Sequence, residues 1–153
     1  MRISTPTNKH IIELMSWFHN ENELKIWSGP NFRYPFNEET FTEDLSIKRL
    51  DSFSLISEKN ELIGFGQCYL RLGRCHLGRL VVSPKQRGKG LVLNLISLLS
   101  NFGMNKFNVE ACSLFVLEEN TPAIKAYKRI GFIATDYPET IPLDNCLYMV
   151  KEL

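Results

Sequence analysis

The chain has 153 residues, 44% of them hydrophobic, which is enough for one filled core and too little for two ordinary domains. Eighteen Lys and Arg balance seventeen Asp and Glu, so no overall charge attracts nucleic acid or an anionic membrane. The chain has no apolar run of the roughly 18 residues that a membrane span needs, and its first ten residues contain no signal-peptide core. We therefore expect a single domain over residues 1–153, in the cytoplasm, without a membrane or nucleic-acid partner.

Apolar residues predict two helices in the N-terminal third of the chain. Four of them recur at helical spacing after Asn8, a plausible cap, so a first helix is expected over residues 8–21. The glycine and prolines of segment 27–37 predict a loop. A second helix is expected to begin near Glu38 and to end before Asp51. The apolar residues of the first helix are Ile11, Leu14, Met15 and Phe18.

The middle of the chain is rich in residues that favour β-strands. Runs at 53–57 and 62–70 are separated by a short polar turn at 58–60, which predicts a hairpin. The run 75–82 is a third strand, and it stops before Pro84 because proline cannot continue a ladder of hydrogen bonds. These three runs predict an antiparallel meander.

The remaining elements change the sheet from antiparallel to mixed. A helix at 91–102 followed by a strand at 109–117 implies a crossover connection. Thr121 is the expected cap of a shorter helix, and Gly131 lies just past its end. Two final strands are expected at 132–134 and 146–150. The predicted fold class is α/β (α+β), with a mostly antiparallel, mixed and twisted sheet of about six or seven strands and about four flanking helices.

The four cysteines are spread along the chain without a CxxC pair. Three of them lie within apolar runs that are predicted to be strands, so reduced and mostly buried thiols are expected. No metal site is predicted. The cysteines are Cys68, Cys75, Cys112 and Cys146.

The stretch 80–92, LVVSPKQRGKGLV, reads as a strand, a basic glycine loop and the start of a helix. Gly88 and Gly90 can take positive φ and carry no Cβ, so backbone N–H groups can converge on a phosphate at the positive end of the helix. A Walker loop would need Ser or Thr after the GK pair, but Lys89 is followed by glycine. A Rossmann GxGxxG fails because Leu93 occupies the last glycine position. The loop alone predicts a generic phosphate site.

Two motifs together resemble the signatures of the GCN5-related N-acetyltransferase (GNAT) superfamily. The cofactor loop of that superfamily reads Arg or Gln, x, x, Gly, x, Gly or Ala, and residues 87–92 read RGKGLV. Val92 departs from this pattern, because the superfamily usually has a small residue there. The second signature, N-x-x-A-x-x-x-Y-x-x-x-G-F, is similar to residues 120–132, NTPAIKAYKRIGF. Its matching residues are Asn120, Ala123, Tyr127, Gly131 and Phe132.

The resemblance implies an acetyl-CoA-dependent N-acetyltransferase that acts on a primary amine of a small molecule or peptide by direct attack on the thioester. It also implies that pantetheine pairs with the strand that ends at Val82, and that a backbone N–H near Val81 polarises the thioester carbonyl. A non-catalytic acyl-CoA sensor or assembly module is the alternative, and a homodimer is left open. The residues that the resemblance assigns to the cofactor are Leu80, Val81, Val82, Arg87, Gly88, Lys89, Gly90, Leu91, Val92, Asn120, Ala123 and Tyr127.

Two residues are candidates for the proton transfers. Tyr127 resembles the tyrosine that the superfamily uses to protonate the leaving thiolate, and the alternative is a core tyrosine with a satisfied hydroxyl. His76 stands where many relatives carry a Glu, and it could relay a proton because histidine titrates near neutral pH. A structurally hydrogen-bonded histidine is an equal alternative. Phe115 occupies the position of the Glu that ribosomal-protein acetyltransferases often use, which disfavours that mode of catalysis.

The acceptor pocket is expected near the loop between the first two predicted helices. Trp27, Phe32 and Tyr34 cluster there around a glycine and a proline, and aromatic rings can enclose a cation or an apolar group. The alternative is that they seal the edge of a small core. The sequence does not name the acceptor.

Overall fold

The computed structural model describes residues 1–152, so the last residue of the predicted domain lies outside the described part. Within that range the chain forms one sheet of seven strands in the order β1-β2-β3-β4-β5-β7-β6. The strands are β1 (Arg2–Ser4), β2 (Asp51–Ile56), β3 (Leu62–Arg71), β4 (Arg74–Val82), β5 (Ala111–Leu117), β6 (Ile133–Ala134) and β7 (Cys146–Glu152). Neighbouring strands are antiparallel except β4 and β5, which are parallel. The predicted mixed, mostly antiparallel sheet is confirmed.

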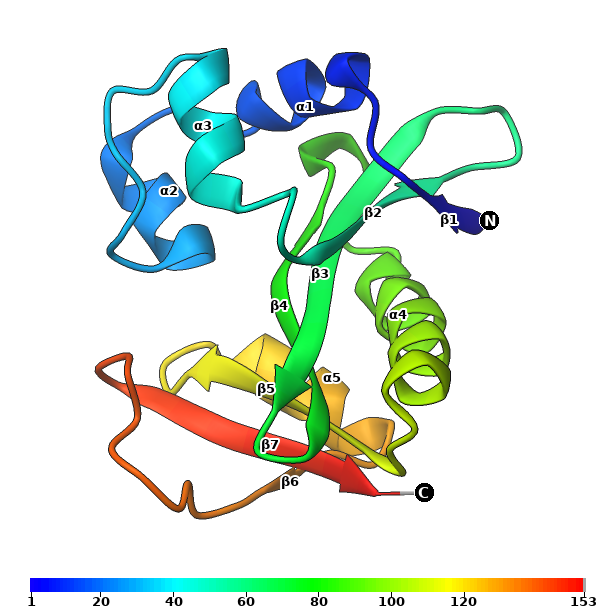
Figure 1. The fold of residues 1–153 in the computed structure, drawn as a ribbon, viewed down its shortest axis with the longest axis vertical. Helices are drawn as coiled ribbons and strands as arrows, with labels where there is room; N and C mark the ends of the chain where they lie inside the picture. The colour runs from blue at the N-terminus through cyan, green and yellow to red at the C-terminus, as the bar shows by residue number, and fades with distance from the viewer. Residues whose placement is uncertain (153) are drawn as a thin grey trace.

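Helices cover the sheet in two groups. The helices are α1 (Asn8–Met15), α2 (Glu21–Ser28), α3 (Glu38–Leu45), α4 (Leu91–Phe107) and α5 (Thr121–Arg129), with a short 3-10 turn, η1, at Pro84–Gln86. In Figure 1, α1, α2 and α3 gather at one end of the long strands, and α4 lies beside β3 and β4 on the other side. Each group buries its own apolar cluster, one beneath α4 and one beneath α1–α3. The sheet therefore separates two cores.

The N-terminal helices differ from the sequence prediction. The first helix ends at Met15 instead of residue 21, and α2 follows it as a separate helix. Asn20 causes the restart, because its side chain accepts a hydrogen bond of 2.8 Å from the Glu23 N–H and so caps a new helix. Trp27 lies in α2 and not in the predicted loop.

Three smaller predictions were also incomplete. Asn120, and not Thr121, caps α5, with its side-chain oxygen 3.4 Å from the Ala123 nitrogen. Helix α4 continues to Phe107 instead of ending at residue 102. Strand β1 was not predicted, because three residues give too short a pattern to recognise.

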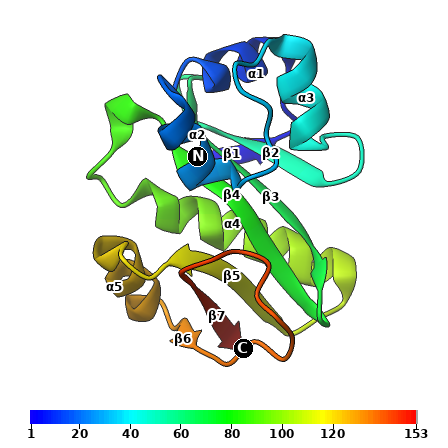
Figure 2. The ribbon, with the colours of Figure 1, turned by 90° about the vertical axis from the view of Figure 1, so that its left-hand side faces the viewer.

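The feature that positions the site is the separation of β4 from β5. These strands pair only from Cys75 to Leu77 on β4, whereas β4 continues to Val82. A bulge lies just beyond the paired part: Arg79 takes a left-handed φ of 49°, and the register with β3 shifts there. Within residues 1–152 the edge of β4 beyond the bulge has no strand partner on the β5 side. Figure 2 shows the two strands running apart.

Close packing of α4 on the sheet depends on Gly103. The cysteines are free and buried, as predicted, and two of them, Cys68 and Cys75, lie beneath this glycine. A Cβ on residue 103 would collide with the Cys75 sulfur. Gly103 therefore lets the helix approach the strands closely.

We predict that Gly103→Ala lowers the free energy of unfolding by about 1–3 kcal/mol, because the added methyl group overpacks the core. At an unobstructed helix position the same change would stabilise by up to about 1 kcal/mol. Urea unfolding monitored by circular dichroism measures the difference. Ser97→Ala, at an exposed position of α4, is the control.

The cause is tested in a Cys75→Ala background, where the collision is removed. In this background Gly103→Ala should lower the free energy of unfolding by less than it does in the parent chain. An equal cost in both backgrounds would contradict this account.

Candidate functional site

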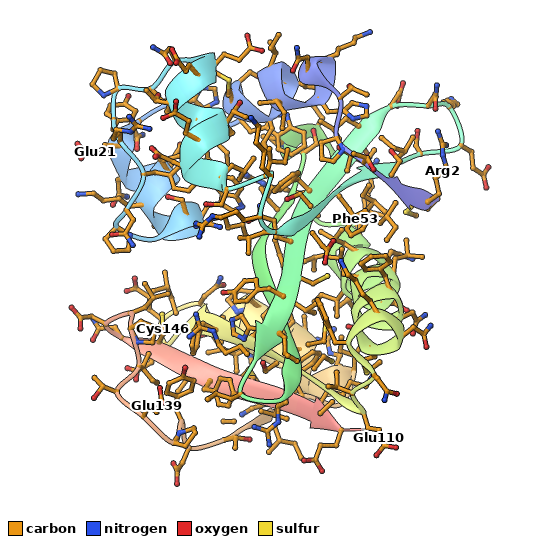
Figure 3. The ribbon with its side chains drawn as sticks, viewed as in Figure 1. Arg2, Glu21, Phe53, Glu110, Glu139 and Cys146 are labelled. Atoms are coloured by element: carbon orange, nitrogen blue, oxygen red, sulfur yellow. The ribbon has the colours of Figure 1, made fainter. Side chains whose placement is uncertain are left out.

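An open pocket of about 720 Å³ lies where β4 and β5 separate. Its walls come from α2 and the loop after it, from β3 and β4, from β5, and from the segment that leads into β7. Cys146, labelled in Figure 3 at the start of β7, is part of the wall. A second hollow, of about 640 Å³, takes its lining only from residues 38–49 and reaches none of the sheet. The first pocket is therefore the candidate site.

The glycine loop forms the N-terminus of α4, as predicted. Gly88 and Gly90 have φ values of 82° and 71°, and a Cβ on either would meet nothing within 4 Å, so conformation and not space requires glycine. Gly90 is the N-cap, and within residues 1–152 no side chain caps this helix end. Arg87 and Lys89 are exposed beside it. The N–H groups of the first turn and the basic side chains together suit an anion.

The last residues of β4, just before the glycine loop, contribute side chains to both cores and to the wall of the pocket. Leu80 lines the pocket and packs against the core beneath α4, whereas Val81 packs against the core beneath α1–α3. Val82 pairs with Gly64 of β3. These side-chain contacts therefore hold residues 80–82 in position. Leu91 and Val92, in the first turn of α4, are half-buried against the core beneath α4.

Tyr127 reaches the pocket from α5. Only 9% of the residue is exposed, and it is one of the residues that line the pocket. Burial raises the pKa of Tyr127, so the hydroxyl keeps its proton at neutral pH. Asn120 also lines the pocket while it caps α5, and Ala123 is half-buried against the core beneath α4. The second motif thus places a neutral phenol at the pocket.

His76 lies in the pocket wall but is almost fully buried, with 1% exposed. Its Nδ1 is 2.9 Å from the Ser113 hydroxyl, and its ring lies between those of Tyr69 and Phe115, at centroid distances of 5.3 and 4.7 Å. Burial, followed by the charge of Arg71, lowers the pKa of His76 to about 3. The ring is therefore neutral and is a weak proton acceptor, which disfavours a role as general base.

The three predicted aromatic residues separate in the structure. Trp27 lines the pocket and its indole N–H donates a 2.8 Å hydrogen bond to the Arg79 carbonyl oxygen. Phe32 is 7% exposed and belongs to the core beneath α1–α3. Tyr34 is 41% exposed, packs on Phe36 and is not among the pocket residues. Only Trp27 is placed to meet an acceptor.

Two arginines in the pocket wall were not predicted. Arg71 donates a 2.9 Å hydrogen bond to the Tyr137 hydroxyl, and Arg79 donates a 2.8 Å hydrogen bond to the Gln67 side-chain oxygen. Both are half-buried. For Arg79 the available signal was a charged residue inside a run that otherwise reads as a buried strand, whereas Arg71 lies just past the predicted strand 62–70 and gave no such signal.

Two further features of the described chain concern membrane-spanning helices and groups of metal-binding side chains. None of the helices in residues 1–152 combines the length and apolar character that a bilayer span requires. The same residues contain no group of three or more His, Cys, Asp or Glu side chains placed to hold a metal ion.

Comparison with known proteins gives one family match and several relatives. Residues 15–132 match the family model described as the acetyltransferase (GNAT) family. An uncharacterized N-acetyltransferase, C1271.07c of Schizosaccharomyces pombe, is 31% identical over 81 residues, which cover 53% of this chain and 49% of that protein. Spermidine N(1)-acetyltransferase of Escherichia coli is 33% identical over 54 residues, which cover 35% of this chain and 29% of that protein. The matched segments thus span about half, or less, of these relatives.

A solved structure extends the likeness to nearly the whole fold. The PaiA N-acetyltransferase of Thermoplasma acidophilum, solved in complex with coenzyme A, superimposes with a TM-score of 0.68 over 99% of this chain and 98% of that chain. Because the identity is 18%, this match shows a shared fold and nothing about the acceptor.

The burial of His76 predicts a pH dependence of stability. A histidine whose pKa is lowered on folding stabilises the protein fully above its unfolded pKa of 6.5, and this stability is lost as the pH falls towards the folded value of about 3. Between pH 7 and pH 5 the expected loss is about 2 kcal/mol. Urea unfolding at several pH values measures it.

His76→Gln should make the free energy of unfolding depend less steeply on pH over this range. His19→Gln, at an exposed histidine, should keep the slope of the parent chain. A parent slope that His76→Gln leaves intact would contradict the assignment.

Proposed function

Because the chain belongs to the acetyltransferase (GNAT) family, we propose that it transfers an acetyl group from acetyl-CoA to a primary amine. One observation carries the proposal: the unpaired edge of β4 runs from the pocket at Tyr127 to the uncapped N-terminus of α4. A ligand with an extended amide chain and a pyrophosphate fits these two features together. The four free cysteines favour the cytoplasm as its location, which stays a prediction.

The residues present fit such a cofactor. The first-turn N–H groups of α4, with Arg87 and Lys89 beside them, would hold the pyrophosphate. Backbone groups at Leu80–Val82 would pair with the pantetheine amides, because this edge of β4 lacks a strand partner within residues 1–152. Val92 is half-buried against the core, so its side chain is turned at least partly inward. When bound, acetyl-CoA supplies an acyl thioester.

Tyr127 is the residue we assign to the leaving group. In the transfer the amine nitrogen forms a bond to the acyl carbon, the carbon–sulfur bond breaks, the amine loses a proton and the sulfur takes one. Because Tyr127 lines the pocket and keeps its proton at neutral pH, its hydroxyl is available to donate that proton. Neutral His76 contributes to the pocket wall.

The activity is tested by the release of free thiol from acetyl-CoA in the presence of a panel of amines. We expect Tyr127→Phe to lower kcat by roughly 10²-fold or more, because it removes the proton donor. Its Kd for CoA, measured by calorimetry, should change little. Tyr34→Phe, at an exposed tyrosine outside the pocket, is the matched control.

Two outcomes would contradict this proposal in different ways. Full activity of Tyr127→Phe would remove the proton-donor role. Binding of acetyl-CoA without thiol release on any amine would instead favour a non-catalytic acyl-CoA sensor.

We also predict that Gly90→Ala weakens acetyl-CoA binding. The left-handed φ of 71° costs a residue with a Cβ about 1–2 kcal/mol, so the loop will shift and displace the N–H groups of α4. The KM for acetyl-CoA should rise by roughly tenfold. Gly73→Ala is the matched control, because Gly73 has a φ of 74°, an equally open surrounding and a place in the β3–β4 turn. Gly73→Ala should lower the free energy of unfolding by a similar amount without a change in the KM for acetyl-CoA. Equal KM values for the two variants would refute the assignment of the loop to the cofactor.

A further inference from the structure

The pocket has an unbalanced set of charges. Four of its lining residues are cationic, and Asp144 is the one carboxylate among those described. Asp144 is exposed and lies in the segment before β7. His76 adds no charge, because it is neutral at any pH well above 3. The cationic residues are Lys25, Arg49, Arg71 and Arg79.

Lys25 and Arg49 are exposed at the rim, whereas Arg71 and Arg79 are half-buried in the wall. Lys25 has a carboxylate partner, Glu21, at 3.4 Å. Within residues 1–152 neither Arg71 nor Arg79 forms a salt bridge. Arg49 also has no salt bridge within residues 1–152, but it is exposed to solvent. The two wall arginines are therefore the half-buried charges of the pocket without a carboxylate partner.

The fold holds these guanidinium groups in place through neutral partners. Arg71 lies over the rings of Tyr69 and Phe115, at 5.5 and 5.2 Å from their centroids. Arg79 lies 5.1 Å from the centroid of Phe32 and bonds the fully buried Gln67. Such contacts orient a cation but leave its charge uncompensated.

Several donors of these arginines remain unused. In both residues only Nη1 has a hydrogen-bond partner within residues 1–152, and the Nε atoms are buried without one. An unpaired half-buried cation is costly unless a ligand supplies the anion. Among residues 1–152, Asp44 is the one carboxylate whose charge acts on the pKa of Arg79, and it already forms an ion pair of 3.0 Å with Arg33.

Arg71, the last residue of β3, lies too far from the glycine loop to bind the phosphates of the cofactor. It pairs with Arg74 at the first residue of β4, whereas the glycine loop follows the last residue, Val82. A strand of this length separates its ends by about 25 Å. The anion for Arg71 must therefore belong to something other than the pyrophosphate.

We propose that the acceptor is a primary amine that also carries an acidic group, a carboxylate or a phosphate, which binds to Arg71 and Arg79. This inference rests on the proposed acetyl transfer and names the class of its acceptor. Planar guanidinium donors match both acidic groups, and they repel a polyamine such as spermidine, the substrate named for one relative. Arg71 would contact the acidic group from β3 and Arg79 from β4, and Tyr127 lines the same pocket from α5.

The test compares matched acceptors with and without an acidic group. Thiol release from acetyl-CoA is measured with the L-amino acids and their C-terminal amides, with O-phosphoethanolamine and ethanolamine, and with spermidine. We expect kcat/KM to be roughly 10- to 100-fold higher for an acidic acceptor than for its neutral counterpart. The amino-acid and phosphoethanolamine arms show whether the preferred anion is a carboxylate or a phosphate.

Variants tie this preference to the two arginines. Arg71→Gln and Arg79→Gln should each reduce the acidic-to-neutral ratio of kcat/KM by roughly tenfold. Arg71→Lys should restore part of it. Arg2→Gln should keep the parent ratio, because Arg2, labelled in Figure 3 near the N-terminus, is exposed and bonds Asn60. Thermal melting and the Kd for CoA confirm that each variant is folded.

The outcomes distinguish a failure of the acidic-acceptor proposal from a failure of the proposed acetyl transfer. Turnover that is equal or higher with amides, ethanolamine or spermidine overturns the acidic acceptor while acetyl transfer stands. A ratio that survives both arginine variants in folded protein also overturns it. No thiol release with any amine overturns the acetyl transfer itself, and the acceptor class with it.

Discussion

The structure depends on one interruption in the sheet, the divergence of β4 from β5 after Leu77. A continuous ladder would use every backbone group of β4 and leave no pocket between these strands. The bulge at Arg79 bends the strand out of register and leaves the outer part of its edge unpaired. That single change opens the pocket, leaves backbone groups free to pair with an extended ligand, and places the Arg79 side chain in the pocket wall.

The divergence is stable because β4 packs against both cores, and beyond the bulge Leu80 and Val81 contact one core each. The first half lies beneath α4, where Cys75 and Leu77 are fully buried. Beyond the bulge, Val81 packs into the cluster beneath α1–α3, and the Trp27 indole bonds the Arg79 carbonyl. The strand is therefore held open by apolar packing on both faces. Charged groups in the wall add little stability, since unpaired cations are costly to bury.

Local signals made much of the fold predictable. The glycine loop and the start of α5 could be predicted from the sequence because turn and cap residues act on their own neighbours, although the cap itself is Asn120 and not the predicted Thr121. The end of α1 at Met15 was missed because Phe18 continues the apolar spacing beyond it. Phe32 and Tyr34 could not be separated by sequence, since only the packing of α1–α3 buries one and exposes the other.

The charge of the pocket also could not be predicted, and it bears on how an acceptor amine loses its proton. Arg71 and Arg79 come from different strands, and only the divergence of the sheet gives them one cavity. Uncompensated cations disfavour a further positive charge nearby, so they lower the pKa of a bound ammonium group. The proposed acidic group would compensate only part of this charge, and the cations left unpaired would still favour the neutral form of the amine. Such a pocket needs no strong carboxylate base, which agrees with a neutral, buried His76 at the position where a base was expected.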